Sequence, residues 1–337
     1  MKYCDVNQMD VFTGHEYIMI AAANSFGKDK LNWKDRLDWF INNEADLYKD
    51  STVQQAKEPY QFMKALYALR DAREGRSTGY LVGLDATCSG PQLMAAMSGC
   101  HRSAEKVNMT GLNIRSDMYT EMGQALGLDI HRDDLKEAIM TFFYASEKVP
   151  ERVFGDSIGE FYKLMERELP GAYDVMTTLI SCQDHINDSY RYQAPCGSNI
   201  LIRQKVKVVD KLEIKSEVET LDNWYITQQR KEFGRKKMDK SIPANVTHTA
   251  DAWLVRQTVK ACHKLGFEVV HVHDCYFCSP NHMNKLRFIV KSLMAEFSKS
   301  NYLQDCVRSI TGIEDYVYTK VSNDLHTEIM KSNYHIC

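Results

Sequence analysis

The chain has 337 residues, of which 44% are hydrophobic, and its formal net charge is −3. This length can bury one large core or two modest ones, and no run of 18 apolar residues exists that could span a membrane. The start, MKYCDVNQMD, lacks a signal-peptide pattern and the ten cysteines are scattered, so we expect a soluble cytoplasmic protein with reduced thiols.

In chain order, the first part of the sequence alternates helical patterns with polar loops. Helical periodicity runs from Asn32 to Asn42 and again from Val53 to Arg70. A β-branched and aliphatic run at 79–85 predicts a strand that ends at Asp85. Pro91 then occupies a favoured first position of a helix, and residues 102–185 are expected to be helical.

Within that helical region, LDIHRDDLKEAIMTFFYAS at 128–146 predicts one amphipathic helix without Gly or Pro. Arg132, Lys136, Met140 and Tyr144 follow at steps of four, drifting about 40° per step, and therefore share one flank. An ordinary surface helix with a solvated cationic edge would show the same pattern. The functional alternative is a helix that binds a triphosphate and stacks a base on Tyr144.

Residues 196–228 are rich in strand patterns, and two cationic clusters flank Trp224 and Tyr225. The clusters are Arg203, Lys205, Lys207, Lys211 and Lys215, and Arg230, Lys231, Arg235, Lys236, Lys237 and Lys240. Cations with aromatic rings between them suit phosphates and bases. A solvated charged strand is the alternative for the first cluster, and the second is interpreted as a mobile basic loop.

After an expected helix at 249–265, the run EVVHVHDCYF predicts a hairpin at 267–279 that carries a second lone aspartate, Asp274. Two aspartates that each follow an aliphatic run can present their carboxylates to one pair of magnesium ions. Such two-metal sites catalyse phosphoryl and nucleotidyl transfer. Either aspartate alone is more commonly a turn residue. A helix is expected at 282–299.

Together these segments resemble motifs A, B and C of the single-subunit DNA-dependent RNA polymerases of phages and mitochondria. DATCSGPQ resembles that family's Asp-x-x-Cys-Ser-Gly-x-Gln, RDDLKEAIMTFFYAS its Arg-x-x-x-Lys-x-x-x-Met-Thr-x-x-Tyr-Gly helix, and VHVHDCYF its His-Asp-Ser-Phe hairpin. A DMY segment around Tyr119, PANVTHTADAWLV at 243–255 and the final IMKSNYHIC agree in order and spacing. The resemblance covers the chain from about Gly14 to Cys337.

The resemblance implies a metal site and assigns its ligands. It makes Asp85 and Asp274 the ligands of two Mg²⁺ ions, with the backbone carbonyl of Ala86 as a third ligand. We interpret His273 as a residue that orients the hairpin, not as a ligand. Asp251 is interpreted as a helix-capping or hydrogen-bonding group in preference to a further metal ligand.

The resemblance also implies a nucleotide pocket. Arg132 and Lys136 would contact the triphosphate of the incoming nucleotide, because guanidinium and ammonium groups both suit phosphate oxygens. Tyr144 would stack near the template base and help to sense the ribose. His248 would approach the 2′ side of the nucleotide or the minor-groove edge of the new base pair, and Tyr119 would lie close to the same pocket.

Three small residues bear on how the family pattern applies to this chain. Ala145 replaces the glycine that follows the motif B tyrosine, and Cys275 replaces a serine, with little expected change in volume. Gly90 stands near the position where DNA polymerases of this shape carry a glutamate that collides with a 2′-hydroxyl. With Tyr144 and His248 as polar partners for that hydroxyl, RNA synthesis is favoured over DNA synthesis.

The expected fold is α+β and helix-rich, a right-hand polymerase palm and fingers without the thumb, the N-terminal domain or the Asp-x-x-Gly-Arg element. We expect palm at 1–101, fingers at 102–248 with a basic region at 196–242, and palm with a C-terminal foot at 249–337. The implied function is RNA synthesis from NTPs on a DNA template. DNA polymerase or primase activity, or a non-catalytic DNA-binding subunit, are the alternatives.

The resemblance is closest to the larger, C-terminal subunit of a split two-subunit phage RNA polymerase. A second polypeptide is therefore expected to supply the thumb-like and N-terminal parts in a heterodimer. A single-stranded-DNA-binding protein is a further expected partner on duplex templates.

Overall fold

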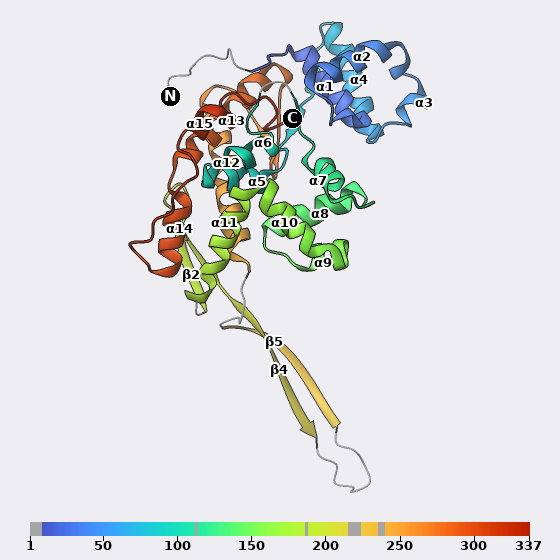
Figure 1. Cartoon of the computed structure of the whole chain (residues 1–337). Helices are drawn as coiled ribbons and strands as arrows, with labels where there is room; N and C mark the ends of the chain where they lie inside the picture. The colour runs from blue at the N-terminus through green and yellow to red at the C-terminus, as the bar shows by residue number, and fades with distance from the viewer. Residues whose placement is uncertain (1–8, 112–113, 186–187, 215–223, 235–239) are drawn as a thin grey trace.

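The computed structural model of the chain describes residues 9–111, 114–185, 188–214, 224–234 and 240–337 (Figure 1). These residues form a helix-rich α+β structure, as the sequence predicts. Part of the two cationic clusters lies outside the described residues, namely Lys215, Arg235, Lys236, Lys237 and the side chain of Lys205.

Helices make up most of the described chain, and they fall into three groups along the sequence. The first group is α1 (Gly14–Ala23), the π-helical turn η2 (Asn24–Lys28), α2 (Trp33–Leu47), α3 (Asp50–Val53) and α4 (Pro59–Arg73). The second is α5 (Ser89–Ser98), α6 (His101–Lys106), α7 (Met118–Leu126), α8 (Arg132–Phe143), α9 (Lys148–Phe154), η3 (Gly155–Ser157), α10 (Ile158–Glu168), α11 (Pro170–Ser181) and η4 (Cys182–His185). The third is α12 (Ile242–Lys264), η5 (Pro280–His282), α13 (Met283–Lys299), α14 (Tyr302–Thr311) and α15 (Leu325–Ile329).

The strands of the described residues form three small antiparallel sheets. They are β1 (Val82–Asp85), β2 (Ser189–Gln193), β3 (Asn199–Arg203), β4 (Lys205–Ile214), β5 (Trp224–Phe233), β6 (Val270–Val272) and β7 (Cys275–Cys278). β2 pairs with β3 and β4 with β5, whereas β7 lies between β1 and β6. The β1–β7 pair therefore joins two parts of the chain that are far apart in sequence.

Several elements differ from the sequence-based expectation. The helix expected from Val53 to Arg70 is interrupted between α3 and α4, and the helix expected to begin at Pro91 begins at Ser89. Helix α12 begins at Ile242, well before the expected start at residue 249, because Pro243 lies in the first turn, where it needs no backbone N–H partner. Arg230 and Lys231 lie in β5 and not in a loop, since this stretch pairs with β4 in regular register. The interpretation of the second cluster as a loop is therefore wrong for these two residues.

One continuous core of buried side chains extends through the described residues. Helix α8 shows how the sequence sets its orientation. Leu135, Ala138, Ile139, Phe142 and Phe143 are buried at helical spacing, so this stripe faces the core. Lys136 and Met140, on the opposite side, are exposed.

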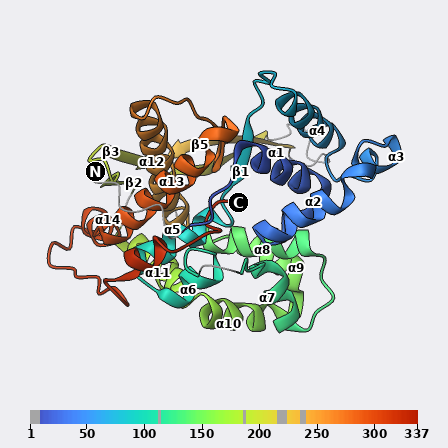
Figure 2. The ribbon, with the colours of Figure 1, turned by 90° about the horizontal axis from the view of Figure 1, so that it is seen from above.

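The segment 332–337 is buried beside β1 instead of lying on the surface. Cys337 N donates to Asp85 O at 2.9 Å and Thr87 N donates to His335 O at 3.3 Å. The fully buried Arg287 donates to Asn333 O at 2.9 Å and to Asp10 O at 2.8 Å. Figure 2 shows this end of the chain in the middle of the molecule, close to β1 and α8.

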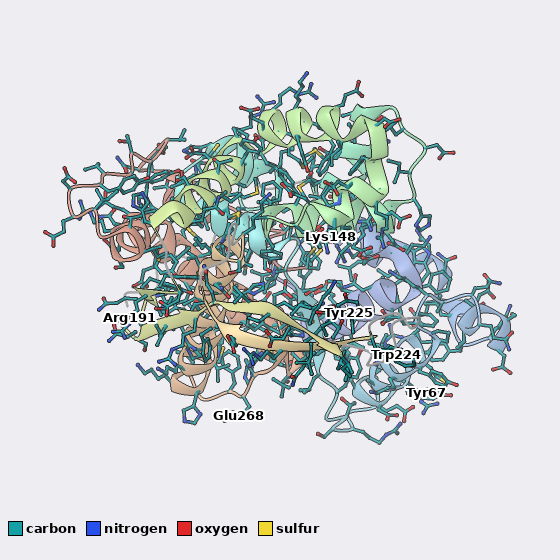
Figure 3. All side chains as sticks on the ribbon, turned by 90° about the horizontal axis from the view of Figure 1, so that it is seen from below. Tyr67, Lys148, Arg191, Trp224, Tyr225 and Glu268 are labelled. Atoms are coloured by element: carbon teal, nitrogen blue, oxygen red, sulfur yellow. The ribbon has the colours of Figure 1, made fainter. Side chains whose placement is uncertain are left out.

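The β4–β5 ribbon projects away from the remainder of the molecule (Figure 1). Its register places Leu212 opposite Ile226 and Ile214 opposite Trp224, all on one face. The other face includes Lys207 opposite Lys231. Trp224 is 75% exposed and Tyr225 is 62% exposed, and both are labelled on the ribbon in Figure 3.

No helix in the described part of the chain is long and apolar enough to cross a membrane. The cysteines of the described residues are free thiols.

The end of α8 carries a strained residue. Ala145 has φ +62°, in the left-handed region that favours glycine. Its N–H donates to Phe142 O at 2.7 Å, and Ser146 N donates to Thr141 O at 3.0 Å, which is the Schellman pattern of a helix C-terminus. The sequence predicts only a small change in side-chain volume where Ala145 replaces glycine. The main effect of this alanine is on the backbone.

We predict that Ala145→Gly raises the free energy of unfolding by about 1 kcal/mol, because glycine adopts this φ without the Cβ penalty. Urea denaturation of both proteins measures the change. Ala125→Gly, at an exposed position inside α7, is the matched control and should destabilise by about 0.5–1 kcal/mol. A loss of stability in the Ala145 variant would contradict the assignment of strain.

Candidate functional site

The β1–β7 pair brings the two predicted metal-binding aspartates together. Asp85 is the last residue of β1 and lies opposite Cys275, the residue after Asp274. Ala86 N donates to Asp274 O at 3.3 Å. The pairing therefore places both aspartates at one end of the same small sheet.

The hairpin that carries Asp274 depends on two local features. His273 has φ +53° in the two-residue connection between β6 and β7, a conformation that histidine adopts more readily than most residues. It is therefore a turn residue, as interpreted from the sequence. Gly83 lies on β1 against the ring of Phe277, where a Cβ would stand 2.3 Å from a ring carbon. Only glycine allows this ring to lie across β1.

The two aspartates are electrostatically coupled. Desolvation by the surrounding protein, then repulsion from Asp274, raise the pKa of Asp85 to about 6, and the ammonium of Lys136 opposes the rise. The Asp85 side chain is exposed to solvent. The desolvation arises from the protein atoms that surround it on several sides. Such a carboxylate pair is unfavourable without a neighbouring cation.

Asp251 belongs to the same electrostatic environment. Desolvation, and then the charge of Asp274, raise its pKa to about 6. It lies in the third turn of α12, so the capping role considered from the sequence is wrong. Within the described ranges, no group of three or more His, Cys, Asp or Glu side chains is arranged to hold a metal ion. The protein thus offers two neighbouring carboxylates and no complete cage of side chains.

A cavity opens beside Asp85. Ala86, Tyr119, Arg132 and Lys136 also line it, so five of the predicted site residues share one cavity. Arg132 donates two hydrogen bonds to Asp117, at 3.0 and 2.8 Å. The Tyr119 hydroxyl donates to Cys88 Sγ at 3.1 Å, which fixes the ring as a wall of the cavity.

Tyr144 and His248 form a second group. Their ring centroids lie 4.7 Å apart, and desolvation lowers the pKa of His248, so its imidazole is neutral at pH 7. A Cβ on Gly90 would stand 2.7 Å from the Tyr144 hydroxyl oxygen. The absence of a side chain at Gly90 therefore makes room for the tyrosine as well as for a substrate.

Several cavity residues were missed by sequence reasoning. They are Asp29, Lys30, Lys106, Arg115, Ser116, Asp117 and Cys337. Most lie on loops or at helix ends, where periodicity does not mark them. Asp117 and Cys337 belong to the DMY and IMKSNYHIC segments, but the resemblance assigned them no role. Only the tertiary contacts bring them beside Asp85.

Comparison with known proteins identifies the family of the chain. A sequence profile of the DNA-dependent RNA polymerase family matches residues 12–153 and 170–335. The chain is 21% identical over 367 residues to the tobacco DNA-directed RNA polymerase 2B, chloroplastic/mitochondrial, and 20% identical over 330 residues to the mouse mitochondrial DNA-directed RNA polymerase. These alignments cover 88% and 81% of this chain.

The chain therefore belongs to the DNA-dependent RNA polymerase family, and the family resemblance expected from the motifs is confirmed. A probable DNA-directed RNA polymerase of Neurospora crassa is 32% identical over a shorter stretch of 117 residues. The chain spans only about a third of the length of its relatives, 35% of the tobacco enzyme and 27% of the mouse enzyme.

The carboxylate coupling leads to a prediction for the metal-free protein. The raised pKa of Asp85 means that its ionised form destabilises the fold above pH 6. This cost decreases as the pH falls from 6 toward 3.9, the ordinary value for an unfolded chain. Asp85→Asn should therefore raise the thermal unfolding temperature at pH 7.5 in EDTA, and the gain should shrink at pH 5.

The control for this measurement is Asp315→Asn, an exposed loop residue, which should show no pH-dependent gain. If Asp85→Asn is less stable than the unmodified protein at pH 7.5, the two aspartates do not repel each other as inferred.

Proposed function

We propose that this chain is the catalytic part of a template-dependent RNA polymerase that transfers nucleotides from NTPs. The observation that carries the proposal is the Asp85 and Asp274 pair at one end of β1–β7, next to a cavity lined by cations. Neighbouring carboxylates beside a cavity lined by several cations suit nucleotidyl transfer. Family membership supports the same reaction.

The residues fit two Mg²⁺ ions. Asp85 and Asp274 would hold them with the carbonyl of Ala86, and the raised pKa of Asp85 indicates a site that gains stability from a cation. Magnesium in such sites is commonly held by one or two carboxylates together with substrate phosphates, so a complete protein cage is not required. When bound, the ions would activate the attacking oxygen and stabilise the leaving one.

The chain's own side chains would bind and orient the nucleotide. Lys136 projects from the solvent side of α8 into the cavity, where its ammonium would contact the triphosphate together with Arg132. Tyr119 would form one wall of the same pocket. The neutral imidazole of His248 and the hydroxyl of Tyr144 would meet the ribose or the new base pair.

We further propose a palm and fingers arrangement for the described residues. The palm would combine residues 1–101 with 249–337, which is supported by the pairing of β1 with β7. Residues 102–248 would form the fingers, with α8 facing the site. Lys207, Lys211 and Lys231 on one face of the projecting β4–β5 ribbon would contact phosphates of the DNA template.

Tyr144 lies beside Gly90 and leaves no room for a bulky side chain that would exclude a 2′-hydroxyl, so ribonucleotides would be admitted. Tyr144 and His248 would favour them by hydrogen-bonding that hydroxyl. A second polypeptide with the thumb-like and N-terminal parts, and a single-stranded-DNA-binding protein, remain predictions of the family resemblance.

The proposal is tested by primer extension on a single-stranded DNA template with ribonucleotides and magnesium. Asp85→Asn and Asp274→Asn should each lower the rate about a thousandfold or more, because losing an anionic ligand costs several kcal/mol of transition-state stabilisation. Asp315→Asn is the matched control and should extend normally. Near-normal extension by either site variant at saturating magnesium would exclude the assignment.

Sugar preference provides a separate prediction. Tyr144→Phe, alone or with His248→Ala, should reduce discrimination against deoxyribonucleotides by about tenfold, since one hydrogen bond to the 2′-hydroxyl contributes about 1–1.5 kcal/mol. The ratio of kcat/KM for the two nucleotides measures this effect. Tyr60→Phe, on an 80% exposed tyrosine of α4, should leave the ratio unchanged. An unchanged ratio in the Tyr144 variants would show that these groups do not sense the ribose.

A further inference from the structure

Five cationic side chains line the cavity beside Asp85. Three of them form ion pairs with carboxylates. Lys30 lies 2.6 Å from Asp29, Lys106 lies 2.9 Å from Glu121 and 3.6 Å from Glu168, and Arg132 is held by Asp117 through two hydrogen bonds. Arg115 and Lys136 complete the set. Across the described ranges, neither of these two forms an ion pair with a carboxylate. They are therefore the cations that an anionic ligand would meet with least competition.

The structure fixes the position of Arg115 through its backbone. Arg115 N donates to Asn32 Oδ1 at 2.9 Å, which ties its loop to the start of α2. The next residue, Ser116, forms two hydrogen bonds with the side chain of Asn108. Ser116 N donates to Asn108 Oδ1 at 2.7 Å, and Asn108 Nδ2 donates to Ser116 O at 2.9 Å. The guanidinium group is therefore presented to the cavity from a backbone held on both sides.

The guanidinium of Arg115 is only partly satisfied. Its Nε donates to Cys337 Sγ at 3.2 Å. Its Nη1 is buried and has no hydrogen-bond partner within the described residues. A buried donor without an acceptor destabilises a protein, so the guanidinium has hydrogen-bonding capacity that the described residues do not use, and it belongs to a residue that lines the cavity.

We propose that Arg115 binds the polyphosphate of the incoming nucleotide together with Lys136, the other cavity cation without a carboxylate partner among the described residues. This inference rests on the proposed function and adds a residue that lies outside the matching motifs. Planar guanidinium donors suit phosphate oxygens, and Arg115 lines the cavity without a carboxylate partner among the described residues. Arg132, already engaged by Asp117, would then contribute less to phosphate binding than its place in the motif suggests.

Two measurements test the proposal. The first is binding of inorganic tripolyphosphate to the full chain by calorimetry, which does not require polymerase activity. Arg115→Gln should weaken binding about tenfold, the scale expected for loss of a charge-assisted hydrogen bond. Arg115→Lys, which retains the positive charge, should give an intermediate value. Arg152→Gln, on an arginine of α9 that is 60% exposed and paired with Glu137, is the matched control.

The second measurement is primer extension, in which Arg115→Gln should raise the KM for ribonucleotides about tenfold with a smaller change in kcat. If Arg115→Gln matches Arg152→Gln in both measurements, or if the unmodified chain does not bind tripolyphosphate, the proposal is wrong. If tripolyphosphate binding depends on Arg115 but the unmodified chain extends no primer, the anion site stands and only the polymerase proposal fails.

Discussion

Mutual repulsion between Asp85 and Asp274 is the constraint on which the site depends. The chain holds these carboxylates together through β1–β7 pairing. Desolvation, and then repulsion from Asp274, raise the pKa of Asp85. Lys136 is the strongest opposing charge on Asp85, but the pKa of Asp85 remains raised to about 6. Neighbouring cations therefore offset the repulsion only in part. Two neighbouring carboxylates that are not neutralised by the protein favour the binding of cations.

The scaffold around β1 explains how this repulsion is withstood. Gly83 lets the Phe277 ring cross the strand, and the segment 332–337 adds backbone hydrogen bonds along the residues that follow it. Arg287 joins that segment to the start of the chain. Burial, together with the nearby charges of Lys291 and Arg287, lowers the pKa of His335 far below its usual value. The His335 imidazole is therefore neutral and adds no positive charge to this segment.

The sequence predicts the parts of the site that motifs and periodicity encode. Asp85, Asp274 and Lys136 follow from strand ends and a helix flank, and the structure brings them together. Arg115 could not be predicted, because its position depends on Asn32 and Asn108, which belong to other parts of the chain. The pairing of Arg132 with Asp117 was equally hidden, since it joins two helices. The alanine at 145 was recognised, whereas its positive φ was visible only in three dimensions.

The hydrogen bonds between β1 and residues 332–337 also affect when the protein becomes competent during its synthesis. Asp85 leaves the ribosome early, but Thr87, Gln92 and Trp33 have partners in a segment translated long afterwards. Contacts of such large sequence separation form late. A nascent chain that still lacks residues 332–337 leaves the strand carrying Asp85 incompletely held. The support of this strand thus depends on residues that lie more than 200 positions further along the chain.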